Sequence, residues 1–77
     1  MQYKLLDIRK NKYGMTQKQF ADMIGMPLDT YSKKERGEHQ FKSDEMFNIS
    51  EIVGEPIGKI FSKRKHRIGN KVNNGTD

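Results

Sequence analysis

Apolar residues in the first sixty positions recur at helical spacing. Leu5, Leu6 and Ile8 form a narrow stripe among charged residues, which predicts a surface helix from about residue 3 to residue 12. Gly14 is expected to end this helix. A strand is the less favoured alternative, because the strict alternation of apolar and polar residues is missing.

A second helix is predicted to begin after Thr16. Thr16 and Gln19 have the spacing of a capping box, in which each side chain accepts a hydrogen bond from the backbone N–H of the other residue. Gly25 is expected to end the helix and to permit a sharp turn. The apolar positions on one face of this helix are Phe20, Ala21 and Ile24.

A third helix, over residues 28–36, is predicted to carry a polar outer face. Pro27 suits its start, where a missing N–H costs nothing, and Gly37 suits its end. Tyr31 is expected to point inward, and Phe41 in the following loop to reach the core. The outer positions, spaced i, i+3, i+4 and i+7, are Asp29, Ser32, Lys33 and Arg36.

The rest of the chain predicts two more helices and a basic tail. Ser43 is expected to cap a fourth helix, and Pro56 to open a short fifth helix. The expected buried stripe of the fourth helix is Met46, Ile49, Ile52 and Val53. With no strand pattern, we predict a compact all-α domain of five helices over residues 1–61 and a basic, flexible tail over residues 62–77.

The chain is basic and contains no cysteine. Its 77 residues include 15 Lys and Arg against 10 Asp and Glu, a formal charge of +5 that favours a polyanion such as DNA, RNA or an acidic membrane face. A basic protein without such a partner is the alternative. The absence of cysteine excludes disulfides, cysteine zinc sites and thiol catalysis. We see no targeting segment and no apolar run that could span a bilayer, so we expect a cytoplasmic protein without a membrane partner.

The sequence offers little for enzyme chemistry. His39 and His66 are far apart and lie outside the predicted helices, so they suggest neither a metal pair nor a general base. There is no glycine loop of the kind that cradles phosphate. We expect no enzyme activity, no cofactor and no metal.

A helix, a turn with glycine and a second helix with a polar outer face make the helix-turn-helix arrangement. The second helix of that arrangement fits the major groove of B-DNA, where side chains near its N-terminus reach base edges. The residues 16–37, TQKQFADMIGMPLDTYSKKERG, resemble the helix-turn-helix domain of the Cro/C1-type (XRE-like) regulators, which include lambdoid phage repressors. The features that match are Gln17, Ala21, Gly25, Tyr31 and the Glu35-Arg36-Gly37 ending.

The resemblance covers about residues 5–61 and implies a lambda-repressor-like fold that binds double-stranded DNA. Gln17, with Thr16, matches a position that contacts a phosphate and supports the recognition helix. Glu35 matches an acid that pairs with a basic residue of the first helix, here Arg9 or Lys10. The whole set implied to contact DNA is Thr16, Gln17, Lys18, Pro27, Leu28, Asp29, Thr30, Ser32, Lys33, Arg36, Gln40 and Lys42.

Several positions depart from the family pattern. The segment between the first two helices is one residue longer than usual, which leaves the choice between Arg9 and Lys10 open. Lys34 stands where the family places an apolar residue, and we expect its stem to cover the core while the ammonium reaches water. At the reading edge, Leu28 can touch only a thymine methyl group, and Asp29 can only accept a hydrogen bond, as from cytosine N4.

The resemblance implies a sequence-specific transcriptional regulator, of which a repressor from a phage, prophage or mobile element is our expectation. Affinity is expected to come from a homodimer on a two-fold operator. The family's last helix nominates Ile57, Ile60 and Phe61 as dimer contacts; if these residues are only core, the protein is a monomer that dimerises on DNA. The alternatives are an antitoxin-like or other protein-interaction module on the same fold, and RNA binding through the tail. The KRKHR run at 63–67 is either a solvated tail or an arm that contacts DNA.

Overall fold

The computed structural model describes residues 1–61, and the predicted tail lies outside these residues. The described chain is helical and contains no strand, which confirms the predicted compact all-α fold of five helices. In order, the elements are α1 (Tyr3–Asp7), η1 (Ile8–Lys12), α2 (Gln17–Ile24), α3 (Leu28–Arg36), α4 (Ser43–Val53) and α5 (Ile57–Ile60).

The first helix continues from α1 into η1, a π-helical turn. The N–H of Tyr13 donates to the carbonyl of Ile8, five residues earlier, at 3.1 Å. A π-turn takes up one more residue than an α-turn. Arg9 is buried within this π-turn.

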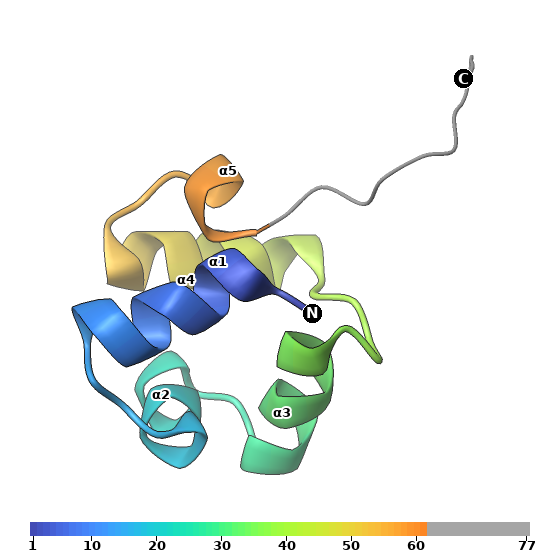
Figure 1. Ribbon diagram of the computed structural model, residues 1–77. Coiled ribbons are helices and arrows are strands. Elements are labelled where there is room, and N and C mark those ends of the chain that lie inside the picture. The colour runs from blue at the N-terminus through green and yellow to red at the C-terminus, as the bar shows by residue number, and fades with distance from the viewer. Residues whose placement is uncertain (62–77) are drawn as a thin grey trace.

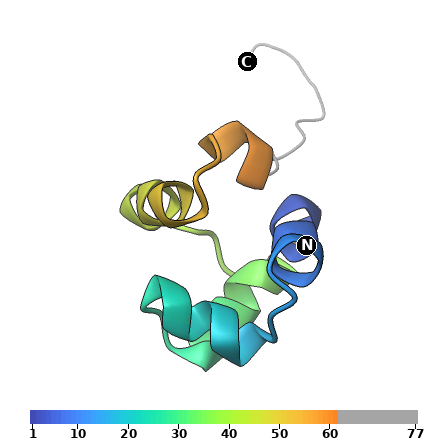
Figure 2. The same cartoon turned by 90° about the vertical axis from the view of Figure 1, so that its left-hand side faces the viewer.

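The helices form two groups around the core. In Figures 1 and 2, α2 and α3 lie at one end of the molecule and α4 with α5 at the other, while α1 packs against α5. An aromatic series runs through the middle from Phe20 to Tyr31, Phe41 and Phe61, with ring centroids 5.0–6.4 Å apart. Phe41 is buried, as predicted, and ties the loop after α3 to the end of the domain.

Two predictions about α4 were wrong in detail. The helix begins at Ser43 itself, so its N-cap is Lys42, whose backbone N–H donates to the Glu45 carboxylate at 2.8 Å. Ile52 is exposed rather than part of the buried stripe, because only Ile49 and Val53 are fully on the core face.

The expectation for Lys34 was also wrong. Its side chain is buried, and its ammonium lies 2.6 Å from the Glu45 carboxylate instead of reaching water. The same ammonium lies 6.0 Å from the centre of the Phe41 ring. A buried cation needs a partner charge, and α4 supplies it.

The three residues nominated as dimer contacts on the last helix differ in exposure within the single chain. Ile60 and Phe61 are buried in the core of a single chain, and only Ile57 remains partly exposed. Four residues of helix cannot bury an apolar face on the core and still present the same side chains to a second copy. Ile60 and Phe61 are therefore core residues.

Candidate nucleic-acid interface

The turn between α2 and α3 is closed by backbone hydrogen bonds. Gly25 has φ = +75°, a left-handed conformation that glycine adopts without the strain of a Cβ. This conformation lets the N–H of Met26 donate to the carbonyl of Ala21 at 2.9 Å, and α3 then begins at Leu28. The Asn48 amide of α4 donates to the carbonyl of Ile24 at 3.2 Å, which ties the end of α2 to the scaffold.

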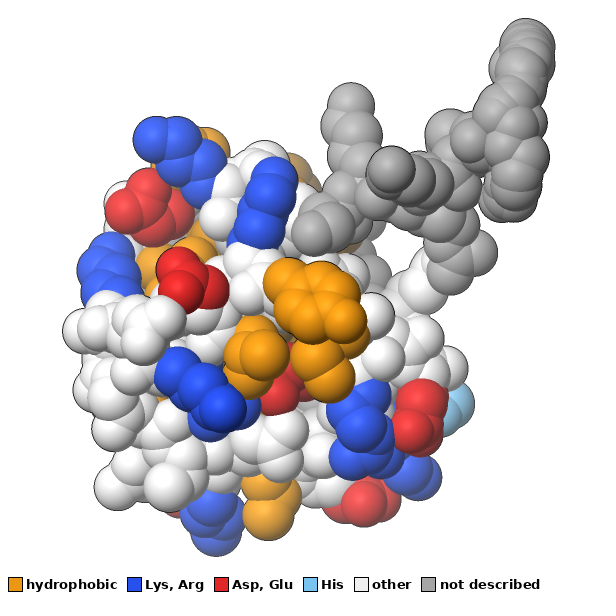
Figure 3. All heavy atoms as spheres, in the orientation of Figure 1, with side chains coloured by type: hydrophobic (Ala, Val, Ile, Leu, Met, Phe, Trp, Pro, Cys, Tyr) orange, Lys and Arg blue, Asp and Glu red, His pale blue; other side chains and the backbone are white. Residues whose placement is uncertain are grey.

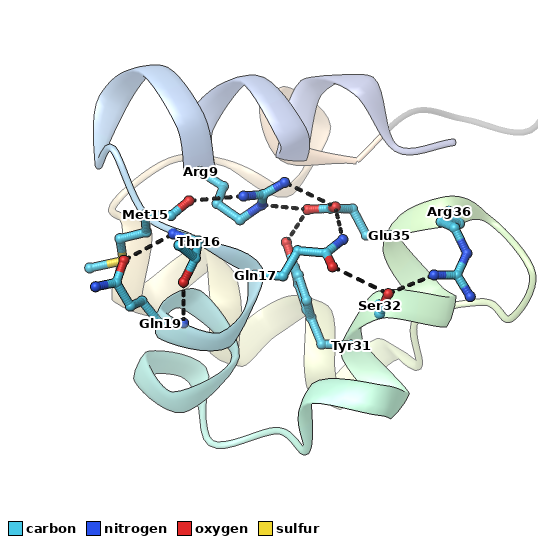
Figure 4. Close-up of polar contacts among 9 residues, drawn as sticks. All are labelled: Arg9, Met15, Thr16, Gln17, Gln19, Tyr31, Ser32, Glu35 and Arg36. Carbon is cyan, nitrogen blue, oxygen red and sulfur yellow. Dashed lines mark hydrogen bonds and ion pairs between the residues drawn. The ribbon is translucent and has the colours of Figure 1, made fainter.

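A buried carboxylate, Glu35, holds the first three helices together. It is 1% exposed and accepts hydrogen bonds from Arg9 at 2.8 and 3.3 Å, from the Tyr31 hydroxyl at 2.5 Å and from the Gln17 amide at 2.7 Å. Figure 4 shows these groups converging between the helices. Of the two basic residues considered for this pair, Arg9 is the partner, and Lys10 is exposed.

The surroundings of Glu35 favour its charged form. Burial by itself raises the pKa of the carboxyl, but the hydrogen bonds from Arg9, Tyr31 and Gln17 outweigh it and hold the pKa below its ordinary value of 4.5. Burial and the hydrogen bond to Glu35 raise the pKa of Tyr31 far above its usual range. Glu35 is therefore an anion and Tyr31 a neutral donor across the physiological range.

The network continues outward from Glu35 to the surface of α3. The amide oxygen of Gln17 accepts a hydrogen bond from the Ser32 hydroxyl at 3.3 Å, and Ser32 in turn accepts one from Arg36 at 2.7 Å. Figure 4 shows Gln17 between the buried carboxylate and Ser32. Gln17 thereby connects the start of α2 to the outer face of α3.

The outer face of α3 carries charged side chains that form ion pairs with one another. Lys33 lies 3.5 Å from Asp29, one turn earlier, and Arg36 lies 2.8 Å from Glu38 in the following loop. The side chains of both cations are more than 40% exposed. Leu28, at the start of the helix, is also 41% exposed.

The other residues predicted to contact DNA are distributed around this face. Pro27, Gln40 and Lys42 are exposed, and Thr30 is partly buried. The Thr16 hydroxyl accepts a hydrogen bond from the backbone N–H of Gln19 at 3.1 Å, and the Gln19 side chain accepts one from the backbone N–H of Thr16 at 2.9 Å. The predicted capping box is therefore present. Lys18 is exposed and pairs with Asp22 at 3.0 Å, one turn later on α2.

A shallow pocket lies behind the start of α3. Its volume is about 340 Å³, and its lining residues, from the turn, α3 and α4, are Ile24, Gly25, Met26, Pro27, Thr30, Asp44, Glu45, Asn48 and Ile49. Two of its acids are accounted for by the fold: Glu45 pairs with Lys34, and Asp44 accepts from the N–H of Glu45.

The sequence reading missed the role of Glu38. Its carboxylate pairs with Arg36 from a loop position two residues later, so neither residue periodicity nor the family pattern points to it. The pairing of Asp29 with Lys33 was detectable, because acid and base stand four residues apart on one helix face. The exposed Phe47 of α4 was also not singled out.

Among residues 1–61, no helix is long and apolar enough to cross a membrane, and no group of three or more His, Cys, Asp or Glu residues is placed to hold a metal ion.

Comparison with known proteins gives one family match. A helix-turn-helix family matches residues 5–60, which include the end of α1 and every later element described above. Neither curated proteins nor solved structures give a match. The match covers most of the chain, including α2, the turn and α3. The chain belongs to the Cro/C1-type (XRE-like) helix-turn-helix family of DNA-binding transcription regulators.

Proposed function

We propose that this protein is a sequence-specific repressor of phage, prophage or mobile-element type that reads the major groove with α3. The observation that carries the proposal is the connected network from Arg9 through Glu35, Gln17 and Ser32 to Arg36. It fixes α3 against η1 and α2 and leaves one face of α3 free of the core. A helix held in that way fits a major groove as a rigid body.

The base-reading part of the surface is proposed to be the start of α3. Leu28 is exposed enough to meet a thymine methyl group, and the Asp29 carboxylate can accept from cytosine N4 or adenine N6. Thr30 and Pro27 flank these residues. Direct reading by so few groups covers a short half-site.

The phosphate contacts are proposed to flank the reading edge on both sides. On one side, the backbone N–H groups of Gln17 and Lys18, in the first turn of α2, have no carbonyl partner within the helix and suit a phosphate oxygen. On the other side, Arg36 and the loop residues Gln40 and Lys42 would meet the second stretch of backbone. Gln17 keeps one amide hydrogen beyond the one it donates to Glu35.

A shift assay with random duplex DNA at low and moderate salt tests the proposal, followed by selection of bound sequences from a random pool. We expect binding at low salt that weakens as salt rises, and enrichment of a two-fold sequence. No binding at low salt would contradict DNA binding, and no enriched sequence would contradict specificity.

Substitutions separate the roles of the surface residues. Lys33→Ala and Arg36→Ala are expected to weaken binding. Gln17→Ala is expected to weaken it about equally on all sequences, because a phosphate contact carries no base information. A change in base preference with Gln17→Ala would contradict its assignment to phosphate.

The main alternative is an antitoxin-like or other protein-interaction module. The observation that favours it is Phe47 on α4, which is 63% exposed, since aromatic residues are enriched at protein–protein interfaces. A protein that binds no duplex at low salt but forms a complex through α4, lost in Phe47→Ala, would favour this alternative.

A further inference from the structure

We propose that Asp29 and Glu38 restrain the affinity of the α3 surface for DNA, and that Asp29 in addition makes this restraint dependent on base sequence. The inference rests on the proposed function. It assigns to these two carboxylates a role opposite to that of the cations beside them.

Charge on the outer face of α3 is balanced. Lys33 and Asp29 form one ion pair, and Arg36 and Glu38 form another, so the four side chains have no net charge. On the face shown in Figure 3, basic and acidic side chains likewise lie beside one another rather than in a continuous basic patch.

The two pairs form one electrostatic group. The hydrogen bond with Glu38 raises the pKa of Arg36, and the charge of Asp29 adds to this effect. The hydrogen bond from Arg36 lowers the pKa of Glu38, with further contributions from Lys33 and His39. Each carboxylate thus acts on both cations.

The domain as a whole has little positive charge to spare. Residues 1–61 contain ten Lys and Arg against nine Asp and Glu, a formal charge of +1, so +4 of the total of +5 belongs to residues 62–77. Each carboxylate on the α3 face therefore removes a large share of the attraction that the domain can exert on phosphate.

The two carboxylates differ in whether a base of the matching DNA site can donate a hydrogen bond to them. Near any duplex, both are repelled by phosphates and compete with them for Lys33 and Arg36. Asp29 lies in the first turn of α3, at the reading edge, where a cytosine or adenine amino group can donate to it. Glu38 lies in the loop after α3, away from that edge. Its repulsion therefore remains on every sequence, whereas that of Asp29 is offset at a matching base.

The test measures binding of the full chain to a labelled random-sequence duplex, and to the duplex selected by the wild type, over a range of salt. The variants are Asp29→Asn and Glu38→Gln. Glu51→Gln is the matched control, because it makes the same change in net charge at an exposed residue of α4. Circular dichroism verifies that each variant is folded.

We expect both variants to bind the random duplex roughly two- to fivefold more tightly than Glu51→Gln, the range for losing one exposed ion-pair partner. Where the released cation gains a phosphate contact, the slope of log K against log salt steepens by about 0.9. Glu38→Gln should tighten binding to both duplexes equally. Asp29→Asn should lower the preference for the selected duplex.

Each other outcome contradicts one part of the proposal or the proposed function itself. If the wild type binds duplex but Asp29→Asn and Glu38→Gln bind no more tightly than Glu51→Gln, the restraint is refuted and the proposed function stands. If Asp29→Asn leaves the preference unchanged, the sequence-dependent part is refuted. If neither the wild type nor any variant binds duplex at the lowest salt, both proposals fail.

Discussion

At the scale of single residues, the carboxylate of Glu35 does most to join the site to the scaffold. It supplies the counter-charge for Arg9, a buried cation from the first helix, and it accepts hydrogen bonds from Tyr31 and Gln17, which orient these two side chains. Removing one partner of a buried ion pair leaves the other charge without compensation, which costs more than the pair itself contributes.

Glu35→Gln is expected to lower the free energy of unfolding by about 3 kcal/mol, because Arg9 would remain buried without a counter-charge. Urea denaturation followed by circular dichroism at neutral pH measures this change. Glu51→Gln, a substitution at an exposed site of α4, should change the stability by less than about 0.5 kcal/mol. Equal effects of the two substitutions would contradict the role assigned to Glu35.

The same carboxylate makes the stability sensitive to acid. The pKa of Glu35 is lower in the folded chain than its ordinary value of 4.5, so the unfolded chain binds protons more readily as the pH falls. The contribution of Glu35 is fully present above about pH 5 and is lost as the pH falls through 4.5 towards the lower folded value. Glu45, whose pKa is also lowered, acts in the same direction.

Urea denaturation of the wild type at a series of pH values between 7 and 3 should therefore show declining stability below pH 5. In Glu35→Gln the decline should be smaller, because one of the responsible groups is missing. An unchanged slope in that variant would show that other carboxylates cause the acid response.

At the scale of elements, the turn after α2 depends on a backbone conformation rather than on a side-chain contact. Gly25 ends α2 in the left-handed region, and a Cβ at this residue would meet no atom within 4 Å. The cost of a side chain there is therefore backbone strain alone. Gly58, in α5, also has open space but lacks a positive φ.

Gly25→Ala is expected to destabilise the domain by about 1 kcal/mol, the cost of a left-handed conformation for a residue with a Cβ. Gly58→Ala provides the control, because alanine in a helix is favoured over glycine by up to about 1 kcal/mol. Thermal denaturation of both variants measures the difference. A neutral Gly25→Ala would mean that the turn does not need the left-handed conformation.

At the scale of the whole molecule, two properties matter for DNA binding: where the net charge lies, and whether the last helix is available to a second copy of the chain. Ile60 and Phe61 are buried within a single chain, and +4 of the net charge of +5 belongs to residues 62–77. We therefore propose a monomer that pairs on its operator. Sedimentation should give one copy without DNA and two copies on the selected two-fold duplex; a stable dimer without DNA would contradict this proposal.

Truncation after Phe61 tests the contribution of the tail. The shortened chain should remain folded, because residues 1–61 contain a core of ten buried apolar residues. Its affinity for duplex DNA should fall, with a salt dependence shallower by about 0.9 for each tail cation that contacts a phosphate. Loss of all nucleic-acid affinity would favour RNA or DNA binding through the tail alone.

Local signals in the sequence are enough to predict the helices, the turn and the family. Periodicity, the capping box at Thr16 and the glycine at 25 are local signals, because a helix is specified by residues three or four positions apart. The inward position of Tyr31 and the five-helix order followed from the same signals.

Which charged side chains form ion pairs can be seen only in the tertiary structure. Arg9 rather than Lys10 reaches Glu35, Lys34 pairs with Glu45 of the next helix, and Glu38 neutralises Arg36 from a loop. These contacts depend on the relative placement of elements, here including the π-turn that carries Arg9. The family resemblance therefore located the proposed DNA-binding surface. The balance of positive and negative charge on that surface is seen only in the folded structure.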